Sequence, residues 1–327
     1  MSNRIDSALE RQFTLAEGAH TPPRLLAAMR HAVFPGGARI RPQLCLAVAA
    51  ACSEDAPALS DAAAVAIELI HCASLAHDDM PCFDDADLRR GRPTVHKAWG
   101  EPLALLAGDA LIVMAFEALA RGAQDCEPGQ VLRLPALLAL VAGSAGVRDG
   151  IVGGQAWECE PRVDLGRYQQ AKTGALFVAA ACAGALAAGR PSAPWMRLGE
   201  CLGEAYQVAD DIRDVLGDAA ALGKPAGQDA HHGRPSAAAD LGLLGALQHF
   251  QGLMQSAIAS VPDCPNREML RQLVRSESER LVPRVACAQL LEAAGMVLPE
   301  GELYAVLPGL HSAAGVSGAS ALHGVAR

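Results

Sequence analysis

The chain of 327 residues is poor in aromatic side chains and has no paired-cysteine spacing and no long run of basic residues. Aromatic residues make up 4% of the chain, while alanine and leucine, both strong helix formers, supply much of its 51% hydrophobic content. The formal net charge of −9 disfavours general nucleic-acid binding. We therefore expect a helical protein with no nucleic-acid partner.

Features of secreted and membrane proteins are also missing from the sequence. The 10 cysteines are scattered, mostly in apolar helical context, as reduced core cysteines are. Residues 1–10 include charged side chains and lack the apolar centre of a secretory signal. The most apolar stretch, residues 174–188, is shorter than the roughly 20 residues that cross a bilayer. We expect a cytoplasmic protein with no membrane span.

Helical periodicity dominates the chain, and no convincing strand alternation is present. Breaks at Pro/Gly clusters separate the predicted helices. These are residues 4–17, 22–33, 40–52, 60–80, 102–121, 129–152, 165–188, 194–217, 238–260 and 266–293. Ser60 and Asp61 are the predicted cap of the fourth helix. We expect one all-α domain of about ten helices over residues 1–300, then a mobile Gly/Ser/Ala-rich tail, 301–327.

Two acidic clusters each end a long apolar helix. The first contains Asp78, Asp79, Asp84 and Asp85, and the second contains Asp210, Asp211 and Asp214. Several carboxylates at the C-terminal end of a buried helix are unfavourable unless something positive is held there. Asp210 and Asp214 share one helical face, and Pro81 interrupts the first helix so that Asp84 can turn back towards Asp78. Either cluster alone would be interpreted as a solvated helix face, but the two together indicate a diphosphate held through Mg²⁺.

Basic residues stand close to both acidic clusters and in an earlier Gly-Gly segment. They are Arg39 and Arg41, Arg89, Arg90 and Arg92, Lys172, and Lys224. Arginine forks bind phosphate oxygens in pairs, and helix N-termini add backbone N–H donors. In a chain of net charge −9, this grouping indicates two anion sites, one bridged by metal and one bound directly.

In combination and order, these segments resemble the trans-isoprenyl diphosphate synthases, the family of farnesyl and geranylgeranyl diphosphate synthases, over about residues 25–285. Residues 68–96 are similar to the geranylgeranyl diphosphate synthases of bacterial carotenoid and photosynthetic-pigment pathways. The resemblance implies an isoprenoid synthase fold around a prenyl-chain cavity. It also implies a homodimer that condenses isopentenyl diphosphate with allylic diphosphates.

The resemblance further implies roles for individual residues. Three Mg²⁺ ions would be bound by Asp78, Asp84 and Asp210, supported by Asp79, Asp211 and Asp214. The allylic diphosphate would also contact Arg89, Lys172 and Lys224. Isopentenyl diphosphate would be held by Arg41, His71 and Arg90. Thr173 and Gln207 stand where the family stabilises the cation and positions the second substrate. His71 lies seven residues before Asp78, on the same helical face, which favours a ligand contact over a core role.

Three positions depart from the family pattern. Ala38 replaces the usual lysine after the paired glycines, so one contact to isopentenyl diphosphate is missing unless Arg39 takes its place. Arg234, which we include among the substrate-binding residues, stands where many members carry lysine. Glu158 replaces the aspartate that follows the Gly-Gly-Gln segment, residues 153–155. None of these changes removes a predicted metal ligand, so we expect an active enzyme.

Product length should be set below the first acidic cluster. Ala73 and Ser74 stand five and four residues before Asp78, about 6–8 Å further down the helix. In bacterial farnesyl enzymes of the family, an aromatic residue at the earlier position stops the chain at C15. Ala73 is small, so we expect a C20 product. A neighbour such as Phe116 could fill the gap, which keeps a C15 product as the alternative.

Three other functions compete with this one. A terpene cyclase usually pairs one aspartate motif with an Asn/Ser/Glu metal motif, whereas the second cluster here keeps Asp214. A non-catalytic regulatory subunit of a partner synthase typically loses one aspartate cluster, and this chain keeps both. A structural helical protein with acidic patches would leave the basic segments unexplained. The synthase is the function that the residues favour.

Overall fold

The computed structural model describes residues 2–34, 37–161, 165–215 and 237–282. The chain divides into a first compact unit, Met1–Leu281, and a second unit, Val282–Arg327. All residues discussed below belong to the first unit. The predicted end of the domain at residue 300 and the tail, 301–327, lie outside the described residues and stay predictions.

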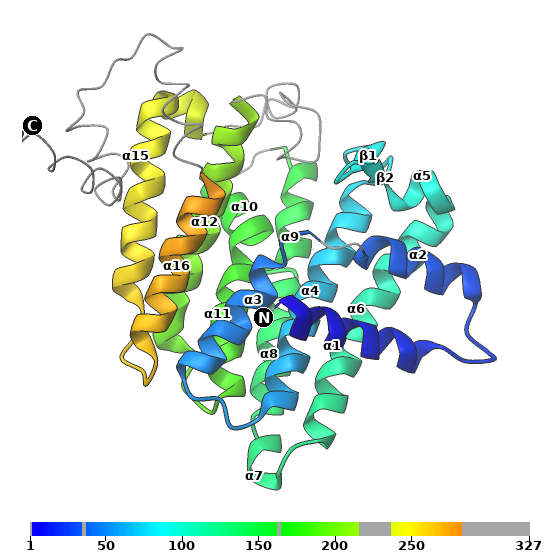
Figure 1. Ribbon diagram of the computed structural model, residues 1–327. Helices are drawn as coiled ribbons and strands as arrows, with labels where there is room; N and C mark the ends of the chain where they lie inside the picture. Colours follow the sequence, from blue (N-terminus) through cyan, green and yellow to red (C-terminus); the bar gives the residue numbers. More distant parts are fainter. Residues whose placement is uncertain (1, 35–36, 162–164, 216–236, 283–327) are drawn as a thin grey trace, which may run out of the picture. The chain divides into compact units, whose positions relative to one another are not determined.

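The described part of the first unit is built almost wholly from helices (Figure 1). Before the first acidic cluster these are α1 (Ser2–Ala16), α2 (Pro23–Val33), α3 (Ile40–Ala51) and α4 (Pro57–Asp78). Then come α5 (Val95–Trp99), α6 (Glu101–Gln124), α7 (Pro128–Val131), α8 (Leu134–Ala145), α9 (Ile151–Ala156), α10 (Leu165–Gln169), α11 (Ala175–Ala187), α12 (Met196–Val215), α15 (Ala237–Ser260) and α16 (Arg267–Leu281). The predicted all-α class is confirmed.

Short irregular elements complete the described secondary structure. Two 3₁₀ turns span Trp157–Cys159 and Ala193–Trp195, and a π-helical turn spans Gln170–Gly174. Two strands of two residues each, β1 (Leu88–Arg89) and β2 (Arg92–Pro93), form an antiparallel hairpin in which Leu88 pairs with Pro93. Strands this short carry no alternating pattern, so the sequence could not predict them.

Several predicted helix boundaries differ from those observed. Helix α4 begins at Pro57, a residue favoured at the first helical position, so the predicted cap at Ser60 and Asp61 is wrong and Ser60 is buried inside the helix. The predicted helix 129–152 is divided into α7, α8 and α9. Gly150 lies in the break between α8 and α9, and a Cβ atom on it would lie 2.5 Å from the backbone nitrogen of Gly146, so the close approach there requires glycine.

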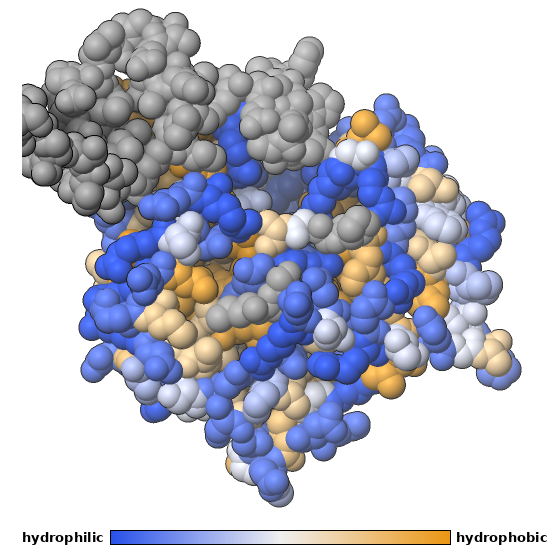
Figure 2. Space-filling view, in the orientation of Figure 1, coloured by the Kyte–Doolittle hydropathy of each residue, from blue (hydrophilic) through white to orange (hydrophobic). Residues whose placement is uncertain are grey.

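Small residues let the central helices approach closely. Helix α4 packs against α3, α6 and α11. A Cβ atom on Gly122 of α6 would lie 2.4 Å from the Cβ of Ala62 in α4, and one on Gly184 of α11 would lie 2.2 Å from the Cys45 carbonyl oxygen in α3. The core therefore reaches close packing through alanine and glycine contacts, which explains how so few aromatic residues suffice. On the face drawn in Figure 2, apolar residues form separate patches among hydrophilic ones.

Four helical stretches are long and apolar enough to cross a membrane, by length and composition alone. They are Pro57–Asp78, Glu101–Gln124, Pro128–Ala145 and Gly166–Ala187. The last one is longer than the 15-residue stretch predicted from the sequence, because the helix continues through the π-helical turn. In the first and last, 72% and 67% of the apolar window is buried inside the protein. Helix packing therefore accounts for the apolar character of these two.

A buried ion pair ties the N-terminal helices to α4. Arg39 stands just before α3 with a left-handed backbone (φ 50°), and its Nη1 donates to Glu68 Oε1 at 2.6 Å. Its Nη2 donates to the Val33 carbonyl oxygen at 2.9 Å. Arg39 and Glu68 are 5% and 2% exposed. The suggestion that Arg39 replaces the missing lysine at position 38 is therefore wrong, because its guanidinium is committed to Glu68.

We predict that Glu68→Gln lowers the free energy of unfolding by about 3 kcal/mol, because it removes the buried counter-ion of Arg39 and leaves it only the more exposed and more distant Asp6, at 3.4 Å. Urea denaturation followed by circular dichroism measures this change. Glu117→Gln is the matched control, since Glu117 forms an exposed pair with Arg121 on α6 and should change stability by less than about 1 kcal/mol. Equal effects of the two substitutions would contradict the assigned role of the Arg39–Glu68 pair.

Candidate active site

The chain curls back immediately after α4, as Pro81 predicted. The helix ends at Asp78, and the Met80 N–H donates to the His77 carbonyl oxygen at 3.1 Å. The Asp84 N–H then returns to the Asp78 carbonyl oxygen at 3.0 Å. The predicted curl is confirmed, and it brings the two ends of the first cluster together although six positions separate them in the sequence.

The hairpin β1–β2 carries Arg89 back onto the first cluster. Its guanidinium donates to Asp79, with Nε 3.0 Å from Oδ1. Asp79 is 2% exposed. Burial and the neighbouring Asp78 and Asp84 raise the pKa of Asp79, although Arg89 lowers it. Burial lowers the pKa of Arg89, but the three aspartates together raise it by more, so the guanidinium stays charged. Asp79 thus holds Arg89 at the cluster, and its predicted support of a metal ion stays a prediction.

Two consecutive residues of the π-helical turn connect the two acidic clusters. Lys172 Nζ lies 3.1 Å from Asp78 Oδ1 of α4. The neighbouring Thr173 Oγ1 donates to Gln207 Oε1 at 3.2 Å, and Gln207 Nε2 donates to Asp211 Oδ1 of α12 at 3.0 Å. Single π-helical turns inside helices occur frequently at functional sites. Five residues predicted from separate segments are thus joined in one network.

Two glycines of α9 bring the π-helical turn to its position. A Cβ atom on Gly154 would lie 2.5 Å from the backbone nitrogen of Lys172, and one on Gly153 would lie 1.9 Å from the Val147 carbonyl oxygen. The Gly-Gly-Gln segment therefore serves close packing. Lys172 stands between α10 and α11, within a continuous helical run.

The second cluster occupies the C-terminal part of α12. Asp210 pairs with Arg213, whose Nε also donates to the Ala209 carbonyl oxygen at 3.1 Å. Asp211 is 3% exposed. The side chain of Asp214, together with Lys224 and Arg234, lies outside the described residues, so the roles predicted for these three stay predictions.

A cationic group without carboxylate partners adjoins the clusters. Arg41 is half-buried, and its guanidinium carbon lies 4.5 Å from the ring centroid of Phe177 and 5.5 Å from that of Tyr206. Its Nη1 is 3.4 Å from His71 Nε2, and its buried Nε has no hydrogen-bond partner. Among the described residues, no carboxylate lies within ion-pair distance of Arg41. An anion would supply the missing partner.

His71 and Arg90 extend this cationic group. Burial, followed by Arg41 and Arg90, lowers the pKa of His71 well below its ordinary value, so the imidazole is neutral near pH 7. Arg90 is exposed and lies against Gly37, where a Cβ atom would be 2.5 Å from its guanidinium carbon. In the described part of the chain, Arg90 also has no ion-pair partner. Of the three residues predicted to bind isopentenyl diphosphate, the two arginines therefore bring positive charge without a carboxylate partner among the described residues, and the histidine is neutral.

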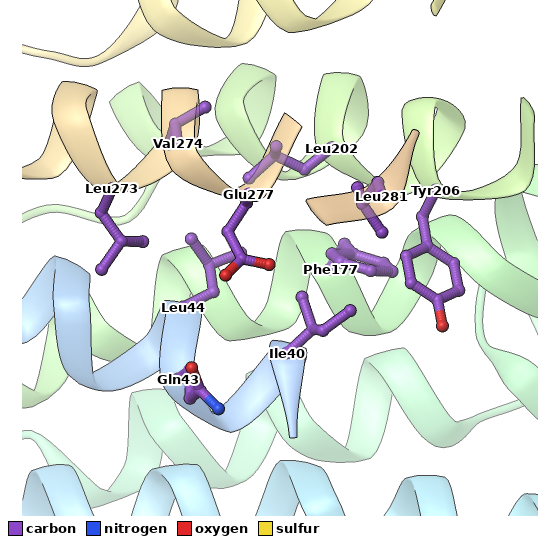
Figure 3. Close-up of a pocket in the computed structure, with 10 residues that line it drawn as sticks. All are labelled: Ile40, Gln43, Leu44, Phe177, Leu202, Tyr206, Leu273, Val274, Glu277 and Leu281. Atoms are coloured by element: carbon purple, nitrogen blue, oxygen red, sulfur yellow. The ribbon is translucent and has the colours of Figure 1, made fainter. Parts of the chain in front are cut away.

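A small apolar cavity lies behind the two rings that support Arg41. It has a volume of about 30 Å³ and lies between α3, α11, α12 and α16. Figure 3 shows Phe177 and Tyr206 on one side and Glu277 of α16 turned towards α3 on the other. A volume of this size holds a water molecule or two. It is too small for an isoprenoid chain, so this cavity is packing behind the site and not the substrate pocket.

Several residues of the site were not predicted as such. Glu158 had been noted only as a departure from the family pattern, and it accepts a hydrogen bond from Lys172 Nζ at 2.7 Å. His77 donates to the Leu105 carbonyl oxygen at 3.1 Å, and a Cβ atom on Gly108 would lie 2.1 Å from its Nε2. Phe177 and Tyr206 support Arg41. None carries a local sequence signal, because each acts on a residue from a distant segment.

The two predicted chain-length residues lie within α4. Ala73 is 1% exposed. Ser74 is half-buried, and its Oγ donates to the His71 carbonyl oxygen at 2.8 Å. The serine hydroxyl is thus satisfied by its own helix, and Ala73 contributes only a methyl group to its surroundings.

The donor set suits a hard cation that takes few protein ligands. Asp78 and Asp210 offer carboxylate oxygens and are now paired with Lys172 and Arg213. No three acidic, histidine or cysteine side chains converge on one point within the described ranges. Mg²⁺ commonly binds one or two carboxylates and completes its shell with water and substrate phosphates. The residues therefore fit Mg²⁺ bound together with a diphosphate.

An all-helical bundle with two aspartate clusters and an adjoining cationic group defines an enzyme of the trans-prenyltransferase class. The family model for polyprenyl synthetase matches residues 22–264. A geranylgeranyl diphosphate synthase from Cereibacter sphaeroides is 53% identical over 287 residues, which cover 88% of this chain and 98% of the relative. The corresponding enzyme from Rhodobacter capsulatus is 50% identical over 88% of this chain and 99% of its own.

Solved structures agree with this assignment. A geranyltransferase from Helicobacter pylori, complexed with magnesium and isoprenyl diphosphate, superimposes with a TM-score of 0.70 at 27% identity. The match covers 86% of this chain and 99% of that one. The chain belongs to the polyprenyl synthetase family.

We predict that Arg41→Met abolishes the stabilisation that inorganic diphosphate gives the wild-type protein, while stability without ligand changes by less than about 1.5 kcal/mol. The arginine has no carboxylate partner to lose among the described residues, and methionine fills a similar volume against the rings. Thermal denaturation with and without diphosphate measures both effects. Arg39→Met is the control and should destabilise the free protein by about 3 kcal/mol, because it strands Glu68. A diphosphate-induced shift that persists in Arg41→Met would contradict the anion site.

Proposed function

We propose that the protein condenses isopentenyl diphosphate with allylic diphosphates and releases mainly the C20 product, geranylgeranyl diphosphate. The observation that carries this proposal is the network in which Lys172 bonds to one acidic cluster and Thr173 connects to the other. Beside it, Arg41 and Arg90 lack counter-ions among the described residues. A metal-bridged diphosphate and a directly bound one satisfy these two requirements together.

We propose that three Mg²⁺ ions hold the allylic diphosphate at Asp78, Asp84 and Asp210. Bound Mg²⁺ would neutralise the negative charge that develops on the departing diphosphate. The Helicobacter pylori geranyltransferase was solved with magnesium and isoprenyl diphosphate bound, which supports this choice of ion. Asp78 and Asp210 would exchange their present partners, Lys172 and Arg213, for the metal.

The protein's own residues would then separate the two substrates and stabilise the leaving group. Lys172 and Arg89 reach the first cluster and would hold the allylic diphosphate as its C–O bond breaks. Arg41, His71 and Arg90 would hold isopentenyl diphosphate, whose double bond attacks the allylic cation. The new carbocation then loses a proton to the released diphosphate, which restores a double bond and gives the longer allylic diphosphate. The Thr173 and Gln207 oxygens would stabilise that cation. Water must be excluded, because it would quench the cation.

The proposed product length rests on Ala73. Its side chain is the smallest that carries a Cβ atom, so a growing chain that passes α4 meets little bulk at this level. The two relatives at 50% and 53% identity are both named geranylgeranyl diphosphate synthases, which supports C20. A C15 farnesyl product is the alternative, and it requires another side chain to close the passage.

We predict that the purified protein, supplied with Mg²⁺, labelled isopentenyl diphosphate and each allylic starter in turn, yields a dominant C20 alcohol after dephosphorylation. EDTA should remove this product, because the carboxylates alone cannot hold the diphosphate. Chromatography of the alcohols measures chain length. A C15 alcohol would keep the enzyme class and overturn the product assignment. No product with any starter would overturn the catalytic function and favour the regulatory subunit.

We propose that the protein is a homodimer joined through α6 and α8. Leu105, Leu106 and Val113 of α6 are 48%, 48% and 58% exposed and lie on one helical face. Helix α8 packs beside α6 and has no charged residue, and only 17% of the apolar window Pro128–Ala145 is buried. An exposed apolar surface of two adjacent helices marks an interaction site. A second copy is the simplest occupant, because two-fold dimers are the commonest oligomers.

We predict that Val113→Glu converts the dimer into a monomer, because it buries a charge without a partner at the interface. Sedimentation velocity measures the change in mass. Met269→Glu on α16 is the control, since Met269 is 42% exposed outside this surface and its substitution should leave the dimer intact. A wild-type monomer, or a dimer that survives Val113→Glu, would contradict the proposed interface.

We also propose a cytoplasmic location and a place in carotenoid or related pigment synthesis. The cysteines within the described ranges are all free, which suits a reducing compartment. The pathway rests on the resemblance of residues 68–96 to the geranylgeranyl diphosphate synthases of such pathways.

A further inference from the structure

Among the described residues, three side chains donate hydrogen bonds to the carboxylate of Glu158 beside the π-helical turn. Lys172 Nζ donates to its Oε1 at 2.7 Å, and the Tyr168 hydroxyl donates to the same oxygen at 2.5 Å. Gln155 Nε2 donates to Oε2 at 3.0 Å. Its three donors come from α9, α10 and the π-helical turn. The side chain is 23% exposed, so it stands at the rim of the site.

Lys172 is bound by two carboxylates, that of Asp78 in the first acidic cluster and that of Glu158 at the rim of the site. Its Nζ lies 2.7 Å from Glu158 and 3.1 Å from Asp78. Burial lowers the pKa of Lys172, but Asp78, Tyr168 and Glu158 raise it by more, so the amine stays charged. A lysine carries its charge on a flexible stem of four carbons. Glu158, a partner outside the acidic clusters, restricts the motion of this side chain.

We propose that Glu158 is a positioning residue that holds Lys172 in place when Asp78 binds metal, and that Tyr168 fixes Glu158 in the required orientation. This inference rests on the proposed synthase function. Without Glu158, Lys172 would have Asp78 as its one remaining carboxylate partner among the described residues. That pair would compete with the metal for Asp78, and the ammonium would lose its fixed position towards the allylic diphosphate.

The local fold supports an organised role for this carboxylate. The 3₁₀ turn Trp157–Cys159 follows α9 directly, and Gly154 lets α9 touch the backbone of Lys172. Lys172 Nζ also lies 5.8 Å from the centroid of the Tyr168 ring. An ordinary exposed ion pair has one partner and little effect. Glu158 differs because three neutral or cationic donors converge on it from separate elements.

The test compares Glu158→Gln, Tyr168→Phe and the double variant with the wild-type enzyme. Glutamine keeps the shape and removes the charge, and phenylalanine keeps the ring over Lys172 and removes only the hydroxyl. We expect Glu158→Gln to weaken binding of an unreactive allylic thiodiphosphate, measured by calorimetry with Mg²⁺, by about tenfold. The KM for the allylic substrate should rise similarly, while the KM for isopentenyl diphosphate stays within about twofold.

The Tyr168 hydroxyl should act through Glu158, to which it donates its hydrogen bond. Tyr168→Phe is therefore expected to cause a smaller loss in the same direction, and the double variant should be no worse than Glu158→Gln alone. Glu160→Gln is the matched control, because Glu160 is exposed two residues away and outside the network. It should bind and react like the wild type. Thermal denaturation of each variant checks that the fold is kept.

Two results would overturn the inference. If Glu158 had a purely structural role, Glu158→Gln would leave the binding constant of the folded enzyme unchanged, and that result would remove Glu158 from the site. Losses that add fully in the double variant would show that Tyr168 acts independently of Glu158. Failure of the proposed function is distinguishable from both, because the wild-type enzyme itself would then form no prenyl product.

Discussion

Repulsion between carboxylates is the constraint on which the site depends. Helices α4 and α12 each end in adjacent aspartates, and such groups stay ionised together only when cations or donors are held against them. The π-helical turn between α10 and α11 supplies these partners to both helices, through Lys172 to Asp78 and through Thr173 and Gln207 to Asp211. The π-helical turn, a local irregularity in a helix, thus organises both acidic clusters of the site.

In the cationic group of the site, in contrast, a charge is left without a partner of opposite sign among the described residues. Arg39 and Arg41 are two residues apart, yet Arg39 pairs with the buried Glu68 while Arg41 meets only two aromatic rings and a neutral histidine in the described part of the chain. The left-handed backbone of Arg39 turns its side chain towards α4, whereas Arg41 stands in the first turn of α3. The first arginine stabilises the fold. The second keeps an unmet electrostatic requirement that a diphosphate can satisfy.

Contacts between residues close in the sequence could be predicted, whereas contacts between distant segments could not. Asp78 and Asp84 carry local signals, because Pro81 and the spacing of like charges can be interpreted within a few residues. The role expected of Thr173 came from the family resemblance instead. The helical class followed in the same way from periodicity and composition. Arg39 was misjudged because its partner Glu68 lies in another helix. Glu158 was recognised as unusual, but its contacts with Tyr168 and Lys172 depend on a π-helical turn that no periodicity indicates.

The scarcity of aromatic residues is itself part of this organisation. Alanine and glycine contacts such as Gly122 on Ala62 close the core without large rings. The chain has only 3 tyrosines, and two of them adjoin site cations, Tyr206 beside Arg41 and Tyr168 beside Lys172. A ring face stabilises a cation without neutralising it, which a carboxylate would do. In a site that must bind diphosphates, the rings beside Arg41 can therefore hold it in place and leave its charge available to a substrate, whereas Lys172 is held by the carboxylates of Asp78 and Glu158 as well as by a ring.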